Sequence, residues 1–252
     1  MTGHHARALP ADAPEAAIRG EPSHVWRAGQ ERRLAMIARH APLTGRRVLE
    51  VGCGLGMYTG QYRRRFASQV EAFDVEFRRA AQARSHTPHV LVAAGEAMPY
   101  RDNLFDVVIS NEVIEHVRDD RATVAEMVRV CRAGGRIVIF CPNRWYPVEQ
   151  HGHYWRGQYH FGNTPLINYL PDRWRNRLAP HVRTYTRRGL FRLVEGLPVR
   201  VVHYTRIFGG YDNLVARLGM AGRLLRAMLH ALERTPLHVL GLSHLLVLEK
   251  CS

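Results

Sequence analysis

The stretch VLEVGCGLG, residues 48–56, decides the fold of this 252-residue chain. A buried strand, predicted at 46–51, leads directly into glycines at positions 52, 54 and 56. Because glycine has no Cβ, the backbone can turn sharply here and a ligand can approach it closely. A buried strand that passes through such a turn into a helix predicts the first unit of an α/β domain.

Strands alternate with helices on both sides of this turn. Further strands are predicted at 70–75, 89–93, 106–110 and 136–140, and helices at 25–40, 61–67 and 77–84. Another helix begins at Asp119 or Asp120 and ends at Gly134-Gly135, and its shared apolar face holds Val124, Met127, Val128 and Cys131. Helices between successive strands predict a parallel, doubly wound sheet.

The pattern loosens beyond residue 142. Residues 143–182 are rich in Trp, Tyr, His and Pro, and we expect a lid or substrate-facing insertion there. A helix capped by Thr186 should run to Val194, with strands at 198–207 and 244–248. Residues 213–234 predict a long amphipathic helix with an apolar face of Leu214, Leu218, Ala221, Leu225, Met228 and Leu232. Such a helix can pack as a lid or dimer element, or rest on an anionic membrane.

The composition is that of one folded domain, expected over residues 24–252. Residues 1–23 lack a hydrophobic core segment, so we predict a disordered N-terminal tail rather than a signal peptide, and a cytoplasmic protein. No apolar stretch reaches the about 18–20 residues of a membrane span. The four cysteines show no metal-binding spacing, which indicates reduced thiols.

The net charge of +14 raises the question of a polyanionic partner. Of 36 basic residues only Lys250 is a lysine, a bias that points to coding composition rather than to selection for nucleic acid. Residues 141–252 hold 16 basic and 6 acidic residues, a surplus of 10, against 20 and 16 in residues 1–140. This field could attract a phosphate-bearing or membrane-bound substrate, and a solvated arginine-rich surface is the alternative.

The glycine spacing argues against a dinucleotide. The dinucleotide turn has the form GxGxxG, whose third glycine packs helix against strand, and that position here is Met57. The sequence has GxGxG instead, preceded by the acidic Glu50. An NAD(P)-dependent oxidoreductase is therefore disfavoured.

Two further acids lie after the next strands. Asp74 is near the end of the second strand, where a carboxylate can accept hydrogen bonds from both hydroxyls of a ribose. Glu96 comes after the third strand and could accept from an adenine amino group, with Val75 and Met98 against the ring faces. Because the carboxyl ends of parallel strands form the ligand-binding edge of such sheets, the three acids predict a nucleoside site.

Four segments, in order, resemble the motifs of class I S-adenosylmethionine (SAM)-dependent methyltransferases, in particular the type 11 group with its ubiquinone and menaquinone biosynthesis enzymes. They are VLEVGCGLG, EAFDVE (71–76), AAGEAMPYRDNLFDVVISNEVIEHV (93–117) and RVCRAGGRIVIFCPN (129–143). The resemblance implies a Rossmann-like α/β fold with a seven-stranded sheet whose last strand is antiparallel. It also implies SAM as cofactor and S-adenosyl-L-homocysteine as product.

The resemblance also implies roles for single residues. Glu50 and the turn Gly52, Cys53, Gly54 and Gly56 would flank the methionine part of the cofactor. Asp74 would hold the ribose beside Val75, Glu96 and Ala97 would read the adenine, and Asn111 with Glu112 would line the sulfonium end. Arg27 or Arg32 could pair with the cofactor carboxylate, and a solvated helix face is the alternative for both.

Methyl transfer from a sulfonium needs mainly alignment and desolvation, and a hydroxyl acceptor is helped by a base. His116 and His151 are the candidate catalytic residues, with His153 as a further one and a structural role as the alternative for His116. The histidines of the loop have only Glu149 as a nearby acid, so we predict no metal site.

Residues just beyond the fourth and fifth strands narrow the choice of acceptor. The residues SNEV (110–113) lack the Pro-Pro-aromatic element of enzymes that methylate base amines or protein amides. Cys141 lacks a second cysteine for cytosine C5 chemistry, and residues 141–151 resemble methyltransferases of glycan and lipid-linked sugar pathways. The sequence therefore predicts methyl transfer to an oxygen of a sugar, glycolipid or quinone precursor. The alternatives are a non-catalytic binding module with the same fold and a nucleic-acid-associated methyltransferase.

Overall fold

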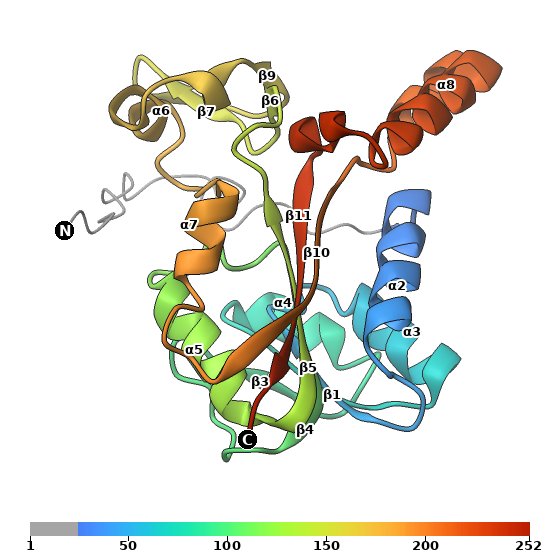
Figure 1. The fold of residues 1–252 in the computed structure, drawn as a ribbon, viewed down its shortest axis with the longest axis vertical. Helices are drawn as coiled ribbons and strands as arrows, with labels where there is room; N and C mark the ends of the chain where they lie inside the picture. The colour runs from blue at the N-terminus through green and yellow to red at the C-terminus, as the bar shows by residue number, and fades with distance from the viewer. Residues whose placement is uncertain (1–24) are drawn as a thin grey trace.

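The computed structural model describes residues 25–252, so the predicted disordered tail at 1–23 lies outside the described part. A seven-stranded sheet has the order β10-β11-β5-β4-β1-β2-β3 (Figure 1). Its strands are β1 (Arg47–Val51), β2 (Gln69–Asp74), β3 (Val90–Val92), β4 (Phe105–Asn111), β5 (Cys131–Pro142), β10 (Val199–Ile207) and β11 (Ser243–Lys250). Strands β1 to β5 pair in parallel, whereas β11 is antiparallel to both of its neighbours. The doubly wound α/β sheet with a reversed last strand is confirmed.

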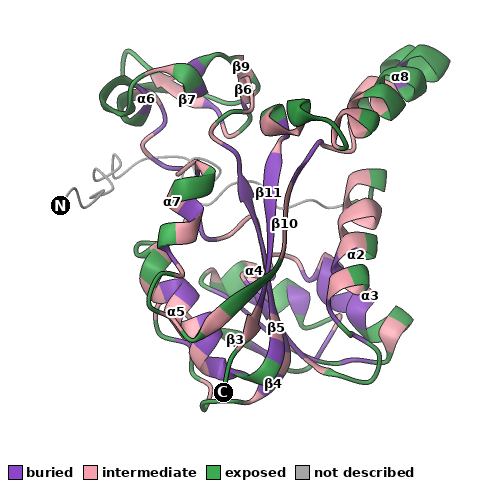
Figure 2. Cartoon of the chain, viewed as in Figure 1, coloured by how far each residue is buried: buried purple, intermediate pink, exposed green. Residues whose placement is uncertain are grey.

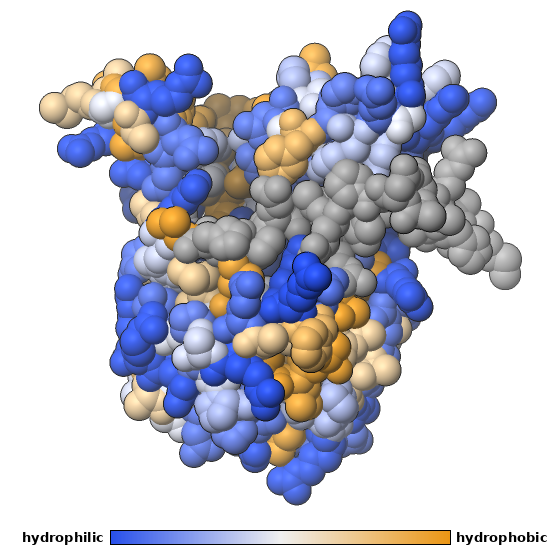
Figure 3. Space-filling model, turned by 180° about the vertical axis from the view of Figure 1, so that it is seen from behind, coloured by the Kyte–Doolittle hydropathy of each residue, from blue (hydrophilic) through white to orange (hydrophobic). Residues whose placement is uncertain are grey.

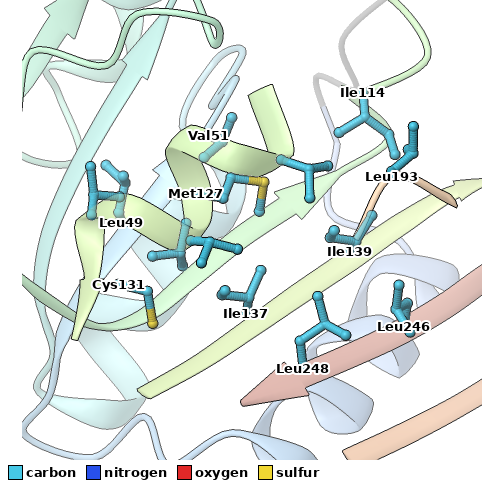
Figure 4. Packing of buried hydrophobic residues seen from close by; sticks show 14 of the residues in the cluster. Leu49, Val51, Ile114, Met127, Cys131, Ile137, Ile139, Leu193, Leu246 and Leu248 are labelled. Carbon is cyan, nitrogen blue, oxygen red and sulfur yellow. The ribbon is translucent and has the colours of Figure 1, made fainter. Parts of the chain in front are cut away.

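Helices cover both faces of this sheet. Helices α2 (Ala28–His40) and α3 (Met57–Phe66) lie on one side, and α5 (Asp120–Val130) and α7 (Arg187–Arg192) lie on the other (Figure 1). Successive residues of β1 divide between the layers, since Val48 joins the α2–α3 core and Leu49 joins the α5–α7 core shown in Figure 4. Burial on both faces explains why the central strands are almost continuously apolar. A smaller cluster packs α4 (Phe77–Ala83) on β2 and β3.

Helix α5 ends earlier than the sequence predicts. It stops at Val130, and Cys131 already belongs to β5, opposite Phe105 of β4. The Nζ of Lys250 donates hydrogen bonds to the carbonyls of Arg129 and Cys131, at 3.2 and 2.8 Å. These tertiary contacts satisfy the end of the helix before Gly134-Gly135 is reached, which local helix signals could not reveal.

Residues 143–182, predicted as an irregular insertion, form small hairpins and short helices at one end of the molecule (Figure 1). The elements are β6 (Val148–Glu149), β7 (His153–Trp155), β8 (Gln158–His160), β9 (Thr164–Pro165), η1 (Ile167–Tyr169) and α6 (Asp172–Leu178). A buried ion pair joins them, because Arg175 of α6 contacts Glu149 of β6 at 3.0 Å. Its use as a lid stays a prediction.

The predicted amphipathic helix is α8 (Asp212–Leu232), interrupted at Gly219 by a non-helical backbone (φ 52°, ψ −120°). It projects from the domain, and most of its length is exposed (Figure 2). Its polar side faces the protein: Arg226 and His230 hydrogen-bond the carbonyls of Gly210 and Gly209. Of the six residues predicted on its apolar face, Leu218, Ala221, Leu225 and Met228 are exposed, so most of that face does not pack on the described chain. Between residues 25 and 252 no helix is long and apolar enough to cross a membrane.

Candidate active site

The glycine turn joins the end of β1 to α3. Gly52, Gly54 and Gly56 all have positive φ, between 53° and 79°. A Cβ on Gly52 would lie 2.7 Å from both methyl carbons of Val113, so a larger residue does not fit there. The backbone N–H of Cys53 donates to the carbonyl of Phe73 at 2.9 Å and ties the turn to β2. The turn is thus held against β2 and the segment after β4.

A cavity of about 1040 Å³ opens at the carboxyl ends of these strands. This is at the upper end of the about 300–1,000 Å³ usual for small-molecule sites. Most of the predicted site residues line it: Glu50, Gly52, Cys53, Gly54, Asp74, Val75, Glu96, Asn111, His116 and His151. Gly56 and Ala97 do not line it, and their predicted roles stay predictions.

Asp74 holds the turn in place. Its Oδ2 accepts a hydrogen bond from the backbone N–H of Gly54, and its Oδ1 accepts from that of Glu76, both at 2.9 Å. A carboxylate has about four acceptor positions, so two remain for a ligand's hydroxyls. The geometry fits the ribose-binding role predicted for this residue.

Glu50 is buried beneath the turn and accepts a hydrogen bond from the hydroxyl of Thr59. Burial raises the pKa of the Glu50 carboxyl to about 8, and the charge of Asp74 adds to the effect. A cationic ligand group in the cavity would favour the ionised form of this acid.

Glu96 and Met98 make contacts other than those predicted for them with the adenine. One oxygen of Glu96 accepts from the backbone N–H groups of Arg118 and Asp119, at 2.6 and 3.0 Å, and so fixes the segment before α5. Met98 lies in the α5–α7 core rather than on the cavity wall. Of the two side chains expected against the adenine, Val75 alone reaches the cavity.

Arg33 of α2 is a site residue that was not predicted from the sequence. It donates hydrogen bonds to Asn111 and Glu112, both at 2.7 Å, and to Ser243 at 2.8 Å. Its guanidinium lies 5.1 Å from the centre of the Phe140 ring. The signal in the sequence is its position one residue before Leu34, on the inner face of the helix.

The two predicted arginines also line the cavity but have other partners. Arg27 donates to Asn213 at 3.3 Å, and Arg32 donates to Glu233 and to the carbonyl of Phe208. Both contacts hold α2 to the C-terminal segment that carries α8. A role for either arginine with the cofactor carboxylate stays a prediction.

The opposite wall of the cavity begins at Glu112, directly after β4. Its φ of 57° is unusual for a residue with a side chain, and such strain gathers at functional sites. Burial disfavours its charge, but the Arg33 guanidinium and the side-chain hydrogen bonds together outweigh burial and lower the pKa of Glu112. Ser243 also donates a hydrogen bond to this carboxylate, at 2.6 Å. Glu112 is therefore an ionised acid at the cavity.

Glu115 lies behind Glu112 and is fully buried. Within the described chain, neither of its carboxyl oxygens has a hydrogen-bond partner of ordinary geometry. Burial and the negative charge of Glu112 raise the pKa of Glu115 well above its usual range. The pair thus shares one negative charge.

The two predicted catalytic histidines meet beside this acid pair. The rings of His116 and His151 lie edge to face, with centres 5.3 Å apart. Burial and the neighbouring His151 lower the pKa of His116 to about 3, and its Nδ1 has no partner among the described residues. The Nδ1 of His151 lies 2.8 Å from an oxygen of Glu149. His153 lies apart, stacked on His160 with ring centres 5.3 Å apart.

This geometry can be compared with known proteins. Residues 49–139 match the family model described as a methyltransferase domain. The chain contains a class I methyltransferase domain. The type 11 group predicted from the motifs is thereby confirmed, and the match spans β1 to β5 with the glycine turn and the end of β4.

Curated relatives resemble the methyltransferase domain rather than the whole chain. The malonyl-[acyl-carrier protein] O-methyltransferase of Salmonella typhimurium is 38% identical over 103 residues, which cover 39% of this chain and 40% of that protein. The ubiquinone biosynthesis O-methyltransferase of Aromatoleum aromaticum is 31% identical over 123 residues, 44% of this chain and 50% of that one. The chain thus spans half or less of the length of these relatives.

A solved structure extends the likeness of the fold beyond the matched region. The SAM-dependent methyltransferase from Mesorhizobium loti superposes with a TM-score of 0.61 over 86% of this chain and 96% of that one. The two chains are 17% identical, so this comparison concerns the fold alone.

Proposed function

We propose that this chain transfers a methyl group from SAM to an oxygen of a small-molecule acceptor and releases S-adenosyl-L-homocysteine. The observation that carries the proposal is one cavity joining the Gly52–Gly56 turn and Asp74 to the wall of Glu112, His116 and His151. The methyltransferase family match supports the reaction class. The two relatives named above are O-methyltransferases, and this supports oxygen as the acceptor atom.

The cofactor end of the cavity fits SAM in three ways. The turn lines the cavity at Gly52, Cys53 and Gly54, and Val113 packs so closely on Gly52 that no side chain fits there. Asp74 keeps acceptor positions for two hydroxyls. The buried acid Glu50 favours a ligand that brings positive charge. When bound, SAM supplies a methyl group on a sulfonium, which leaves as a neutral thioether.

The residues of the chain align the reactants and remove water from them. Arg33 fixes Asn111 and Glu112 through charged hydrogen bonds, so the sulfonium end of the site is ordered before the ligand arrives. On this proposal His116 and His151, which both line the cavity, form its acceptor side and act on the acceptor oxygen. In-line displacement is assisted by such alignment and desolvation.

Acceptor identity can be tested by turnover with labelled SAM. The panel should contain a catechol quinone precursor, free and lipid-linked sugars, a nucleic acid and a protein substrate. O-methylated quinone precursor, sugar or glycolipid is the expected product, and the Asp74→Ala variant should give none. Exclusive N-methylation of nucleic acid or protein would contradict the proposal. SAM binding without turnover of any acceptor would favour a non-catalytic binding module.

The acceptor reaches the site, on this proposal, from an anionic membrane surface on which α8 rests. The exposed side chains of α8 are largely apolar: Leu218, Met220, Leu224, Leu225 and Met228. Orange side chains among blue ones mark this projecting end in Figure 3. Residues 213–232 hold three arginines and no acidic residue, which suits an anionic surface rather than a neutral one. Gly209, Gly210 and Asp212 at the base of α8 line the cavity, so a lipid-borne acceptor would enter there.

Vesicle sedimentation tests this contact. The protein should pellet with phosphatidylcholine vesicles that contain phosphatidylglycerol, and less with phosphatidylcholine alone. Leu224→Glu with Met228→Glu should abolish pelleting, whereas Leu91→Glu with Val92→Glu, two exposed positions on the edge strand β3, should not. Equal pelleting by both double variants, or a stable dimer that buries α8, would contradict the membrane contact.

A further inference from the structure

We propose that Glu115, His116 and His151 bind one divalent metal ion, Zn²⁺ being the best fit, at the acceptor end of the cavity. One ligand atom from each residue lies within 4.8 Å of the other two. One carboxylate and two imidazoles form a donor set typical of catalytic zinc, which leaves a position open for substrate. Because zinc–ligand distances are about 2.0–2.2 Å, small side-chain rotations would close the site.

Unpartnered polar atoms point to a missing ligand here. Both carboxyl oxygens of Glu115 and the Nδ1 of His116 are buried, and in residues 25–252 none of the three has a hydrogen-bond partner of ordinary geometry. Glu115 has no exposed surface. A buried polar group left unsatisfied costs about 1–3 kcal/mol, and more if charged, so such groups are rare without a water or ion. A cation between these side chains would give the Glu115 carboxylate and a ring nitrogen of His116 the partner that they lack.

The surroundings of His151 are those of a metal-binding histidine. Its Nδ1 lies 2.8 Å from Glu149, which leaves Nε2 free for an ion. Glu149 is fixed in turn by the buried Arg175 at 3.0 Å. Carboxylates that orient a ligating histidine in this way are typical of metal sites.

The site opens toward the acceptor. His116 and His151 line the cavity, as does the ionised Glu112. An acceptor hydroxyl bound to the ion would have a lowered pKa and would release its proton to solvent. The resulting oxygen anion then forms the O–CH₃ bond while the S–CH₃ bond breaks and the thioether leaves. This catalytic role rests on the proposed function, whereas binding of the ion does not.

The sequence pattern predicted no metal site, because acids are scarce within the loop of His151, His153 and His160. The fold supplies the carboxylate from elsewhere: Glu115 comes after β4 and meets the loop across the cavity. His153 instead contacts Thr164 at 2.9 Å and stacks on His160. His153 therefore provides a matched control, since it is a histidine of the same loop outside the proposed site.

The test is calorimetric titration with Zn²⁺ of full-length protein stripped by a chelator, with zinc content measured after dialysis. One zinc per chain is expected. Glu115→Gln and His151→Gln should each weaken binding at least tenfold, and His153→Gln should leave it unchanged. Thermal unfolding of the wild type should shift upward with zinc, a readout that needs no variant.

Two outcomes would overturn the proposal: a wild type that retains no zinc, or one whose binding is weakened as much by His153→Gln as by His151→Gln. SAM titration of the same samples separates the two proposals. SAM binding without zinc binding rejects the metal site and leaves the proposed function standing. Zinc binding without SAM binding rejects the proposed function and leaves the metal site standing.

Discussion

Among single residues, Glu50 and Arg33 differ in how much the sequence could reveal. An acid directly before a glycine turn marks a ligand site by its position, and Glu50 indeed lines the cavity. Arg33 is one arginine among many on a helix surface, and only the folded chain brings it to Asn111 and Glu112. The place of Arg33 beside Leu34 indicates the inner face of the helix, but a local pattern cannot show which distant residues a charged side chain meets.

Glu50→Gln should change how stability depends on pH. The folded-state pKa of Glu50 is raised from 4.5 to about 8, so the unfolded chain ionises first. The wild type should therefore lose stability as pH rises from about 4.5 to 8, by up to about 1.4 kcal/mol per pH unit, with no further loss above that window. Urea unfolding without SAM at pH 5 and pH 8 measures this. Equal pH slopes in wild type and variant would refute the buried-acid account.

Arg33→Met should be strongly destabilising. The variant leaves Glu112 charged and partly buried with its cationic partner removed, and such losses cost about 3 kcal/mol or more. Arg27→Met is the control, since the exposed Arg27 side chain has a single long hydrogen bond to Asn213 and should cost within about 0.5 kcal/mol. The measurement is the free energy of unfolding in urea. Equal losses would mean that Arg33 does not organise the site.

At the scale of elements, regular strands and helices were predictable, and their ends and partners were less so. Buried strands are predicted at 46–51 and 106–110 from the apolar residues within them, and β1 and β4 occupy nearly those bounds. The end of α5 was misplaced because Lys250 and β4 satisfy it from a distance. The hairpins within 143–182 escaped prediction because strands of two or three residues carry no periodic signal.

The glycine turn offers an element-scale prediction with a matched control. Gly52→Ala adds a Cβ 2.7 Å from Val113 at a φ of 63°, so it should displace the turn and weaken SAM binding at least tenfold. Gly45→Ala meets the same backbone penalty at a φ of 67° with no atom within 4 Å. It should lose about 1–2 kcal/mol of stability and keep SAM affinity. Calorimetry and urea unfolding of both variants measure the two effects.

Comparison with Gly45→Ala also shows which result would contradict contact between the turn and the cofactor. If Gly52→Ala binds SAM as tightly as Gly45→Ala does, the turn does not contact the cofactor. Adding Val113→Ala to Gly52→Ala should recover part of the affinity, because it removes the two carbons that the new Cβ would strike. Such recovery would assign the effect to the clash rather than to backbone strain.

At the scale of the whole molecule, the order of motifs was enough to predict the sheet and the cofactor side of the cavity. Asp74 and the glycine turn come from adjacent parallel strands, so their meeting is a consequence of topology. The acceptor side was not predictable in the same way. His151 joins Glu115 and His116 only because the insertion folds over the ends of β4 and β5, an arrangement set by the buried Arg175–Glu149 pair.

The outward apolar face of α8 is likewise a property of the whole molecule. The periodicity of residues 213–234 predicted a helix but not which face would meet the domain. In the fold, Asp212 accepts hydrogen bonds from the start of α2, at Ala28 and Gly29, and turns the polar side inward. The resulting exposed surface lies beside the cavity rather than remote from it.

The measurement that tests the central claim most directly is calorimetric titration of the full-length protein with SAM and S-adenosyl-L-homocysteine, with NADH and Asp74→Ala as controls. The account predicts one SAM per chain with micromolar affinity, loss of binding in Asp74→Ala and no heat from NADH. A folded protein that binds neither SAM nor S-adenosyl-L-homocysteine, or that binds NADH instead, would contradict it.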